Sequence, residues 1–250
     1  MGRVSPYPGC NGSWRPHRRT RRRRSGMKFL YLCHRLLQRL SFGRAGIVPY
    51  FFYAQPVLTA PARQRGRAPV EVERARGRAC LPASLPRPEA VIEGRFAAGS
   101  QCLFIAKDGE LLGYLWLHRG PYREDEVRAV FTPEPAERSA WDYDVYVAPA
   151  YRLGRTFSRL WEAANNDLRA GGVCWCHSRI SAFNTSSIAV HEKLGARRIG
   201  WACFLCLGRL QVMVSSLKPR LHCSLSIAPS VTLPSPKAGT LPPAREPLCR

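Results

Sequence analysis

Apolar residues return every three or four positions in several parts of the chain, the spacing that places them on one face of an α-helix. The clearest stripe lies in residues 156–170, and a glycine pair ends it. A shorter apolar stripe, with basic residues between its members, covers residues 28–40. Two further helices are expected at residues 88–98 and directly after Asn184. The pattern therefore predicts four helices.

Short apolar runs and apolar–polar alternation between these helices predict β-strands. An Asp-Gly turn signal at residues 108–109 joins two of them into a hairpin. Residues 119–140 are polar and contain proline, so we expect a long loop that borders a functional site. The expected strands are residues 47–58, 70–73, 102–106, 111–117, 143–147, 173–180, 199–207 and 210–214.

The order of these elements predicts an α/β fold with a mixed sheet and helices on both faces. Residues 68–216 form the expected domain. Residues 27–67 precede it as an amphipathic helix, an apolar strand and a basic linker. We expect residues 1–26 to be a disordered basic arm and residues 217–250, rich in Pro and Ser, to be a disordered tail.

The chain of 250 residues is strongly basic, with 39 Lys and Arg against 17 Asp and Glu. Eight arginines lie in residues 1–26, which contain no acid. Such a surface attracts anions, so nucleic acid is a candidate partner of the Arg-rich arm. The basic helix of residues 28–40 is expected either to pack on its own domain or to lie on an anionic membrane surface.

Ten cysteines raise the question of disulfides. The sequence shows neither a cleavable signal peptide nor an apolar run long enough to span a membrane, which favours a cytoplasmic protein with reduced thiols. The pairs Cys174/Cys176 and Cys203/Cys206 have metal-like spacing but lie in apolar, strand-like runs. We therefore interpret them as buried hydrophobic residues and expect no metal.

A strand that runs through a short turn into a helix carries the most informative chemistry. This stretch reads from Asp144 to Trp161. The first N–H groups of a helix lack internal acceptors and lie at the positive end of its dipole, a geometry that binds phosphate oxygens. Arg152 and Arg155 add positive charge there. The stretch is thus a candidate phosphate cradle.

Two sequence blocks resemble the GNAT superfamily of N-acetyltransferases. Tyr151-Arg152 and residues 158–164 fall into register with the family's pyrophosphate loop, Gln/Arg-x-x-Gly-x-Gly/Ala, and the helix that follows it. Residues 184–195 are similar to the family's Asn-x-x-Ser/Ala-x-x-x-Tyr-x-Lys-x-Gly segment. The resemblance implies a largely antiparallel mixed sheet, with acetyl-CoA as the acyl donor and a small-molecule or peptide amine as the acceptor.

The resemblance also implies which residues hold the donor. The candidates for the pyrophosphate are Arg152, Leu153, Gly154, Arg155, Thr156, Phe157 and Ser158. Those for the pantetheine arm are Val145, Tyr146, Val147, Asn184 and Ser187. Two loop positions depart from the family pattern, because Arg155 and Phe157 occupy its glycine positions. The Phe157 ring either turns into the core as part of the helix stripe or blocks the pocket.

The catalytic candidates are one histidine and three carboxylates. His191 stands where the family places a tyrosine acid, and an imidazolium can also protonate a thiolate. The alternative is an inert histidine that is hydrogen-bonded on the inner face of its helix. Asp144, Asp142 and Glu126 are candidates for the base that deprotonates the amine, with Asp144 ranked first because burial would raise its pKa. The function expected first is an N-acetyltransferase, and the alternative is a non-catalytic basic module that binds nucleic acid or an anionic membrane.

Overall fold

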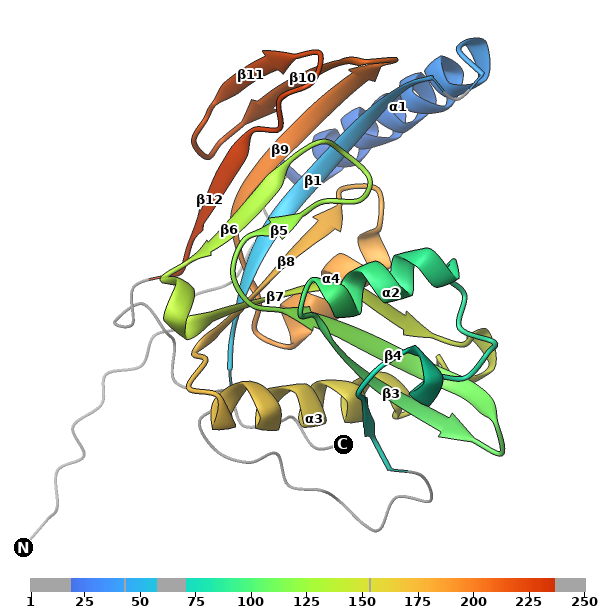
Figure 1. Ribbon diagram of the computed structural model, residues 1–250. Helices are drawn as coiled ribbons and strands as arrows, with labels where there is room; N and C mark the ends of the chain where they lie inside the picture. Colours follow the sequence, from blue (N-terminus) through green and yellow to red (C-terminus); the bar gives the residue numbers. More distant parts are fainter. Residues whose placement is uncertain (1–18, 43, 58–70, 153, 237–250) are drawn as a thin grey trace, which may run out of the picture.

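A nine-stranded mixed sheet forms the frame of the protein (Figure 1). The computed structural model describes residues 19–42, 44–57, 71–152 and 154–236. The strands follow the order β11-β10-β9-β1-β8-β7-β4-β3-β2. Their bounds are β1 (Ala45–Pro56), β2 (Glu73–Ala75), β3 (Gln101–Lys107), β4 (Glu110–His118), β7 (Ser139–Val147), β8 (Trp175–Ser181), β9 (Arg197–Leu207), β10 (Leu210–Ser215) and β11 (Leu221–Ser224).

Among the described strands of this sheet, only β7 and β8 run parallel, and each other neighbouring pair is antiparallel. The hairpin of β3 and β4 turns at Asp108 and Gly109, both of which have positive φ. The expected α/β fold with a largely antiparallel mixed sheet is therefore confirmed.

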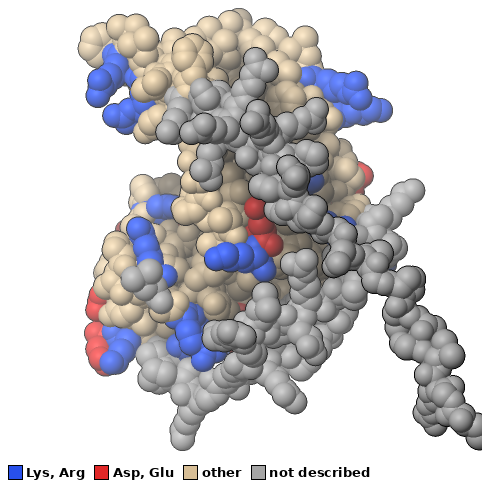
Figure 2. Space-filling model, turned by 180° about the vertical axis from the view of Figure 1, so that it is seen from behind, with Lys and Arg blue, Asp and Glu red and all other residues tan. Residues whose placement is uncertain are grey.

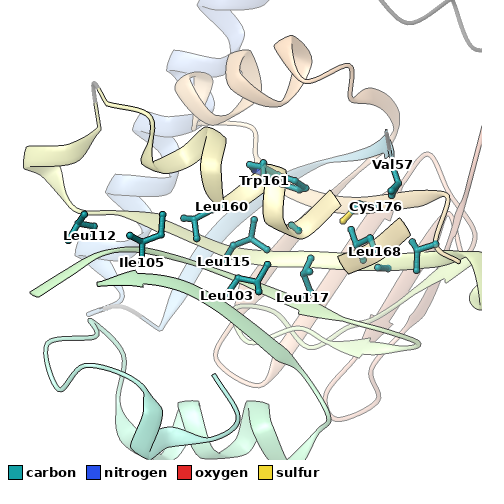
Figure 3. Close-up of a cluster of buried hydrophobic side chains, with 13 residues drawn as sticks. Val57, Leu103, Ile105, Leu112, Leu115, Leu117, Leu160, Trp161, Leu168 and Cys176 are labelled. Carbon is teal, nitrogen blue, oxygen red and sulfur yellow. The ribbon is translucent and has the colours of Figure 1, made fainter. Parts of the chain in front are cut away.

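Helices cover both faces of the sheet, as expected. They are α1 (Arg19–Leu40), α2 (Glu89–Ala97), α3 (Thr156–Ala170) and α4 (Thr185–Lys193), with short 3₁₀ turns η1 (Arg78–Cys80), η2 (Ala136–Arg138) and η3 (Pro149–Tyr151). The α3 stripe, with Leu160 and Trp161 buried, packs on Leu115 and Leu117 of β4 (Figure 3). On the opposite face, the Phe96 ring of α2 meets the Trp116 ring with centroids 5.0 Å apart.

A second, three-stranded sheet lies where the sequence predicted a loop and a disordered tail. Its strands are β5 (Tyr122–Arg123), β6 (Val130–Glu134) and β12 (Ser230–Pro234), and β12 runs parallel to β6. Phe131, Val231 and Leu233 are fully buried and pack in one cluster with Phe52 of β1. The prediction of disorder is wrong for residues 217–236, because β11 pairs with β10 and β12 buries Val231 and Leu233 beside β6, contacts that local periodicity did not reveal.

The N-terminal strand β1 lies inside the main sheet, between β8 and β9. Tyr50 and Phe52 are fully buried there. The expected boundary at residue 68 therefore does not separate two units, because the sheet would lose a central strand. Helix α1 begins at Arg19, inside the segment expected to be a disordered arm, whereas residues 1–18 lie outside the described residues.

Candidate active site

Strands β7 and β8 separate at one point of the sheet, and the candidate site lies there. They pair only from Ser139–Trp175 to Asp142–Ser178, although β7 continues to Val147. The edge of β7 that faces β8 therefore loses its partner strand beyond Asp142. Such an edge offers backbone N–H and C=O groups to an extended ligand.

A cavity of about 390 Å³ lies at this separation, between β7, β8 and α4. Both strands lead from it to the beginning of a helix, β7 to α3 and β8 to α4. Candidates for the acid, for the base and for the pantetheine contacts meet here although they are distant in sequence. The lining includes Glu126, Asp142, Asp144, Val145, Asn184, Ser187 and His191.

His191 lines this cavity and has a buried ring nitrogen without a partner among the described residues. Its Nδ1 lies 2.8 Å from the Ser187 carbonyl oxygen, one turn earlier in α4. A carbonyl oxygen can only accept, so Nδ1 carries a hydrogen and donates it. Nε2, buried, has no hydrogen-bond partner among the described residues. It is therefore the ring atom that is left to exchange a proton with a bound molecule.

Helix α4 is held in place by its cap. The Asn184 side-chain oxygen accepts from the Ser187 backbone N–H at 3.1 Å, as expected for an N-cap asparagine. The helix ends before Gly195, whose φ of 88° suits glycine. The cap fixes the first turn of α4 and, with it, the position of His191 one turn further on.

Asp142 is a buried carboxyl on the α3 side of the sheet. The Ser178 hydroxyl donates to its Oδ2, and the Cys176 thiol lies 3.9 Å away. Burial raises the pKa of Asp142, and the positive charge of His191 and the Ser178 hydrogen bond oppose that rise. A cavity-lining carboxyl with a raised pKa holds a proton more tightly than an ordinary carboxyl does, which suits a group that accepts a proton.

Asp144 is held in an ion-pair cluster. Arg87 donates to both carboxylate oxygens at 2.8 and 2.7 Å, and Arg95 donates to Oδ2 at 2.7 Å. The Tyr114 hydroxyl lies 3.3 Å from the same oxygen. The carboxylate is buried, which was the condition for ranking Asp144 first as a base, but its acceptor positions are already occupied. This arrangement favours a structural role over that of a base.

The two arginines were not among the sequence-based candidates. Arg87 precedes α2 and Arg95 lies near its end, and their guanidinium groups reach the cavity across the sheet face. Arg95 also lies over the Trp116 and Tyr143 rings at 5.2 and 5.0 Å. No local pattern separates these arginines from the many others in the chain, so only the tertiary contacts identify them.

Glu126 lies at the exposed rim of the cavity and accepts from the Tyr50 hydroxyl. The neighbouring Glu124 is buried and forms an ion pair with Arg179 of β8, whose guanidinium lies 4.8 Å from the centre of the Tyr50 ring. Glu126 is therefore the most solvated of the three candidate bases. Arg179 and Glu124 were also missed, because their pairing joins two segments far apart in sequence.

The candidate phosphate loop follows β7. A 3₁₀ turn, η3, leads to α3, whose N-cap residue Arg155 makes no side-chain capping hydrogen bond. Arg152 is exposed and donates through Nε to the Val147 carbonyl oxygen at 3.1 Å. Gly154 and Ser158 are exposed, and Leu153 lies outside the described residues. Thr156 is buried, so the first turn of α3 exposes Ser158 beside the exposed Arg152 and Arg155.

The Phe157 ring turns away from this loop. It packs with the apolar cluster beneath α3, 6.4 Å from both the Trp161 ring and the His191 ring between centroids. Of the two alternatives for this residue, the structure favours the one in which the ring joins the helix stripe. The same contact helps to hold the His191 imidazole, because Trp161 also meets it edge to face at 6.0 Å.

The three candidates on β7 for the pantetheine arm lie at the unpaired end of that strand. Val145 lines the cavity. Tyr146 is half-buried on the opposite side, where its ring stacks on Tyr114 at 5.5 Å. Val147 pairs with Gly113 of β4. Their backbone, rather than their side chains, therefore faces the gap between β7 and β8.

The remaining expectations concern metals, thiols and membranes. The cysteines of the described segments are all free, and these segments hold no cluster of three or more His, Cys, Asp and Glu fit for a metal ion. None of the helices that the structure describes has both the length and the apolar character needed to cross a bilayer. Of the Arg-rich arm expected at residues 1–26, residues 1–18 and the side chains of residues 19–26 lie outside what the structure describes, so no structural observation bears on nucleic-acid binding there.

Several solved structures resemble this chain, each with a TM-score below 0.5. A protein described as a GNAT-family acetyltransferase from Novosphingobium aromaticivorans DSM 12444 is 19% identical over 64% of this chain and 64% of its own, with a TM-score of 0.45. The ribosomal-protein-alanine N-acetyltransferase of Brucella melitensis is 27% identical over 42% and 59%, with a TM-score of 0.32. The chain thus spans less than two thirds of the length of either relative.

An aminoglycoside acetyltransferase from an uncultured soil metagenomic sample is 12% identical over 50% of this chain and 86% of its own, with a TM-score of 0.36. No curated protein matches the chain. The model of the acetyltransferase (GNAT) family matches residues 73–196, a segment that contains β7, α3, β8 and α4 around the cavity. The match assigns residues 73–196 to the acetyltransferase (GNAT) family, whose chemistry is acyl transfer.

Proposed function

We propose that this protein transfers an acetyl group from acetyl-CoA to a primary amine by direct attack of the amine on the thioester. The observation that carries the proposal is the unpartnered, buried Nε2 of His191 at the cavity where β7 and β8 separate. Acyl transfer to an amine requires one group that removes a proton and one that returns a proton to the leaving thiolate. The cavity offers both kinds of group.

His191 supplies the acid in this proposal. With Nδ1–H fixed on the Ser187 carbonyl oxygen, the imidazolium form presents its second proton from Nε2 into the cavity. A thiolate with a pKa near 8.5 accepts that proton readily. The contacts of the ring with Phe157 and Trp161 hold its plane in position.

Asp142 is the carboxylate that best fits the role of base. It lines the cavity, its pKa is raised by burial, and Ser178 orients it. Glu126 remains the second candidate, through water at the cavity rim. Asp144 is the third, because the guanidinium groups of Arg87 and Arg95 occupy its oxygens.

The donor would bind along β7 and at the beginning of α3. The unpaired β7 edge from Val145 to Val147 suits an extended pantetheine arm, and the first turn of α3 suits a pyrophosphate. Arg152, Gly154, Arg155, Thr156 and Ser158 are the candidates at that turn, and Asn184 and Ser187 line the cavity. Neither residue at the family's glycine positions closes the turn in this proposal, because the Phe157 ring packs inward and the Arg155 side chain is exposed.

Acetyl-CoA binding tests the donor assignment. At a concentration about 100-fold above its dissociation constant, a ligand stabilises the native state by about 2.7 kcal/mol, which corresponds to roughly 5–10 °C in melting temperature. Ser158→Glu places a carboxylate in the first turn of α3, where it stabilises the helix but repels phosphate. We expect this variant to fold normally and to lose the acetyl-CoA shift.

Ser226→Glu is the matched control, since it adds the same charge at an exposed site beyond β11. It should keep the full shift. If the wild-type protein shows no shift with acetyl-CoA, the proposal fails. If Ser158→Glu and Ser226→Glu respond equally, the phosphate site is not at α3.

Thiol release from acetyl-CoA with a panel of primary amines tests the chemistry. We expect His191→Gln to lower kcat by about 10²–10⁴ while the acetyl-CoA shift in melting temperature is retained. His118→Gln is the control, because this half-buried histidine bonds to Ser100 and does not line the cavity. An unchanged kcat in His191→Gln would rule out the proposed acid.

A further inference from the structure

Helix α1 presents a row of apolar side chains to solvent. Phe29, Leu32, Leu36 and Leu40 recur at intervals of three and four residues and are 70%, 64%, 58% and 72% exposed. Phe42, just beyond the helix, is 94% exposed. Single exposed apolar residues are ordinary, but a continuous row along one helix face marks an interaction surface.

The opposite face of α1 attaches the helix to its own domain. The backbone N–H of Ile47 donates to His34 Nδ1 at 3.1 Å, and Leu37 is half-buried on the same side. The Tyr31 and His34 rings lie 5.2 and 5.8 Å from the Phe183 ring, which comes directly before the α4 cap. These contacts fix the rotation of α1, so the apolar row points outward rather than onto the sheet.

The outward face is bordered by positive charge. The sequence of α1, RTRRRRSGMKFLYLCHRLLQRL, holds eight Lys and Arg and no acid. Arg35 and Arg39 are exposed and follow Leu32 and Leu36 by three residues each, which makes them neighbours on the helix surface. Seen from behind, Lys and Arg gather at both upper corners of the molecule, the end that holds α1 and the β10–β11 hairpin (Figure 2).

We propose that α1 docks this protein on a bilayer that contains anionic lipids. An apolar row flanked by basic residues is the pattern of a helix that lies in the plane of a membrane interface, with its apolar side chains between the acyl chains and its cations among the headgroups. Contacts with nucleic acid are mainly polar and electrostatic and leave the exposed Phe and Leu row without a partner. A second copy of α1 would bring eight more positive charges against the first, which disfavours pairing of these helices.

Binding of the full-length chain to vesicles tests this surface. The probes are phosphatidylcholine vesicles with about 30% phosphatidylglycerol, and phosphatidylcholine vesicles alone. We expect the protein to sediment with the anionic vesicles, and to bind at least about tenfold more weakly to the neutral ones or in about 0.5 M NaCl. The double variant Leu32→Glu/Leu36→Glu should lose at least about tenfold in affinity for the anionic vesicles.

Leu221→Glu is the matched control. Leu221 on β11 is 67% exposed, like Leu32, but does not belong to the α1 row. It should bind anionic vesicles as the wild type does. All three proteins should show the same melting temperature, because the substituted side chains are exposed.

Three results would overturn the proposal. The first is equal vesicle binding by Leu32→Glu/Leu36→Glu and the wild type. The second is a wild type that binds duplex DNA or RNA but neither vesicle. The third is a wild type that forms dimers in solution, without vesicle binding, and becomes monomeric in the double variant. Acyl transfer to soluble amines should be equal in all three proteins, so failure of this proposal does not depend on the proposed function.

Discussion

Asp142 and Asp144 lie two residues apart on β7 but point to opposite faces of the sheet. Asp142 pairs with Leu117 and Asp144 with Trp116, and the register shifts between these two partners. Adjacent residues of β4 point to opposite faces, so their partners do too. A β-bulge at Tyr143 therefore sends one carboxyl toward α4 and the other toward α2.

This divergence gives the two carboxyls different chemical surroundings. Asp142 meets Ser178 and the charge of His191, whereas Asp144 meets Arg87 and Arg95. Without the bulge, strict alternation would place both on one face, where their charges would repel each other. The bulge thus assigns one carboxyl to proton exchange and the other to an ion-pair cluster.

Asp144→Asn should destabilise the protein because it removes the charge that Arg87 and Arg95 share, and among the described residues Arg95 keeps only the exposed Asp125 as a counter-charge. The Asp144 side chain is only 9% exposed, and that of Arg95 10%, so solvent compensates little for the loss. We expect the free energy of unfolding in urea to fall by about 3 kcal/mol. Asp125→Asn is the control, since Asp125 is 59% exposed and should cost less than about 1 kcal/mol. Equal effects of the two substitutions would contradict a buried cluster.

Asp142→Asn should raise the stability of the protein at neutral pH. Burial raises the pKa of Asp142 above the ordinary 3.8, so the folded protein binds this proton more tightly than the unfolded chain. The stabilising contribution is present below pH 3.8 and is lost as the pH rises through the raised pKa. The amide cannot ionise and avoids that loss.

Urea unfolding at several pH values measures this effect. The advantage of Asp142→Asn over the wild type should grow from acid to neutral pH and vanish near pH 3.8. The same variant should lose acyl transfer if Asp142 is the base, whereas Glu126→Gln should retain most of it. A variant that is less stable than the wild type at neutral pH would argue against a raised pKa.

We expect the free energy of unfolding to fall on mild acidification because of the buried His177 ring. The ring is fully buried in β8, and Nε2 lies 3.3 Å from the Ser235 hydroxyl oxygen. Burial lowers the pKa of His177 from 6.5 to about 4, so the unfolded chain takes up this proton first. The contribution of the neutral ring is present above pH 6.5 and is lost as the pH falls toward 4.

The size of this effect follows from the shift in pKa. A difference between 6.5 and about 4 corresponds to roughly 3 kcal/mol across that range. Urea unfolding at pH 7.5 and pH 4.5 should show this decrease in the wild type and a smaller one in His177→Gln. A decrease of the same size in His177→Gln would assign the acid sensitivity to another group.

Gly113→Ala should destabilise the contact between β4 and β7 beside the candidate site. A Cβ at Gly113 would lie 2.7 Å from the Tyr146 carbonyl oxygen, closer than real contacts allow. We expect a loss of about 1–3 kcal/mol in the free energy of unfolding. Gly94→Ala in α2 is the opposite control, because its Cβ meets no atom within 4 Å and alanine favours the helix by up to about 1 kcal/mol. A stabilised Gly113→Ala would contradict this packing.

The sequence by itself determined the elements whose signals are local. The α3 stripe predicted its bounds at residues 156–170, the Asp-Gly signal predicted the β3–β4 turn, and Asn184 predicted the beginning of α4. It also indicated His191 and Asp142, and the structure brings both to one cavity. These features depend on periodicity, capping and turn chemistry within a few residues, which a single sequence displays.

Only the tertiary structure decided which distant segments pair. β1 enters the sheet between β8 and β9, and β12 runs beside β6, a hundred residues earlier in the chain. The bulge that separates Asp142 from Asp144, and the guanidinium groups that surround Asp144, also arise from such contacts. Pairing of distant strands is set by burial and register in the folded chain, and local residue order carries little information about it.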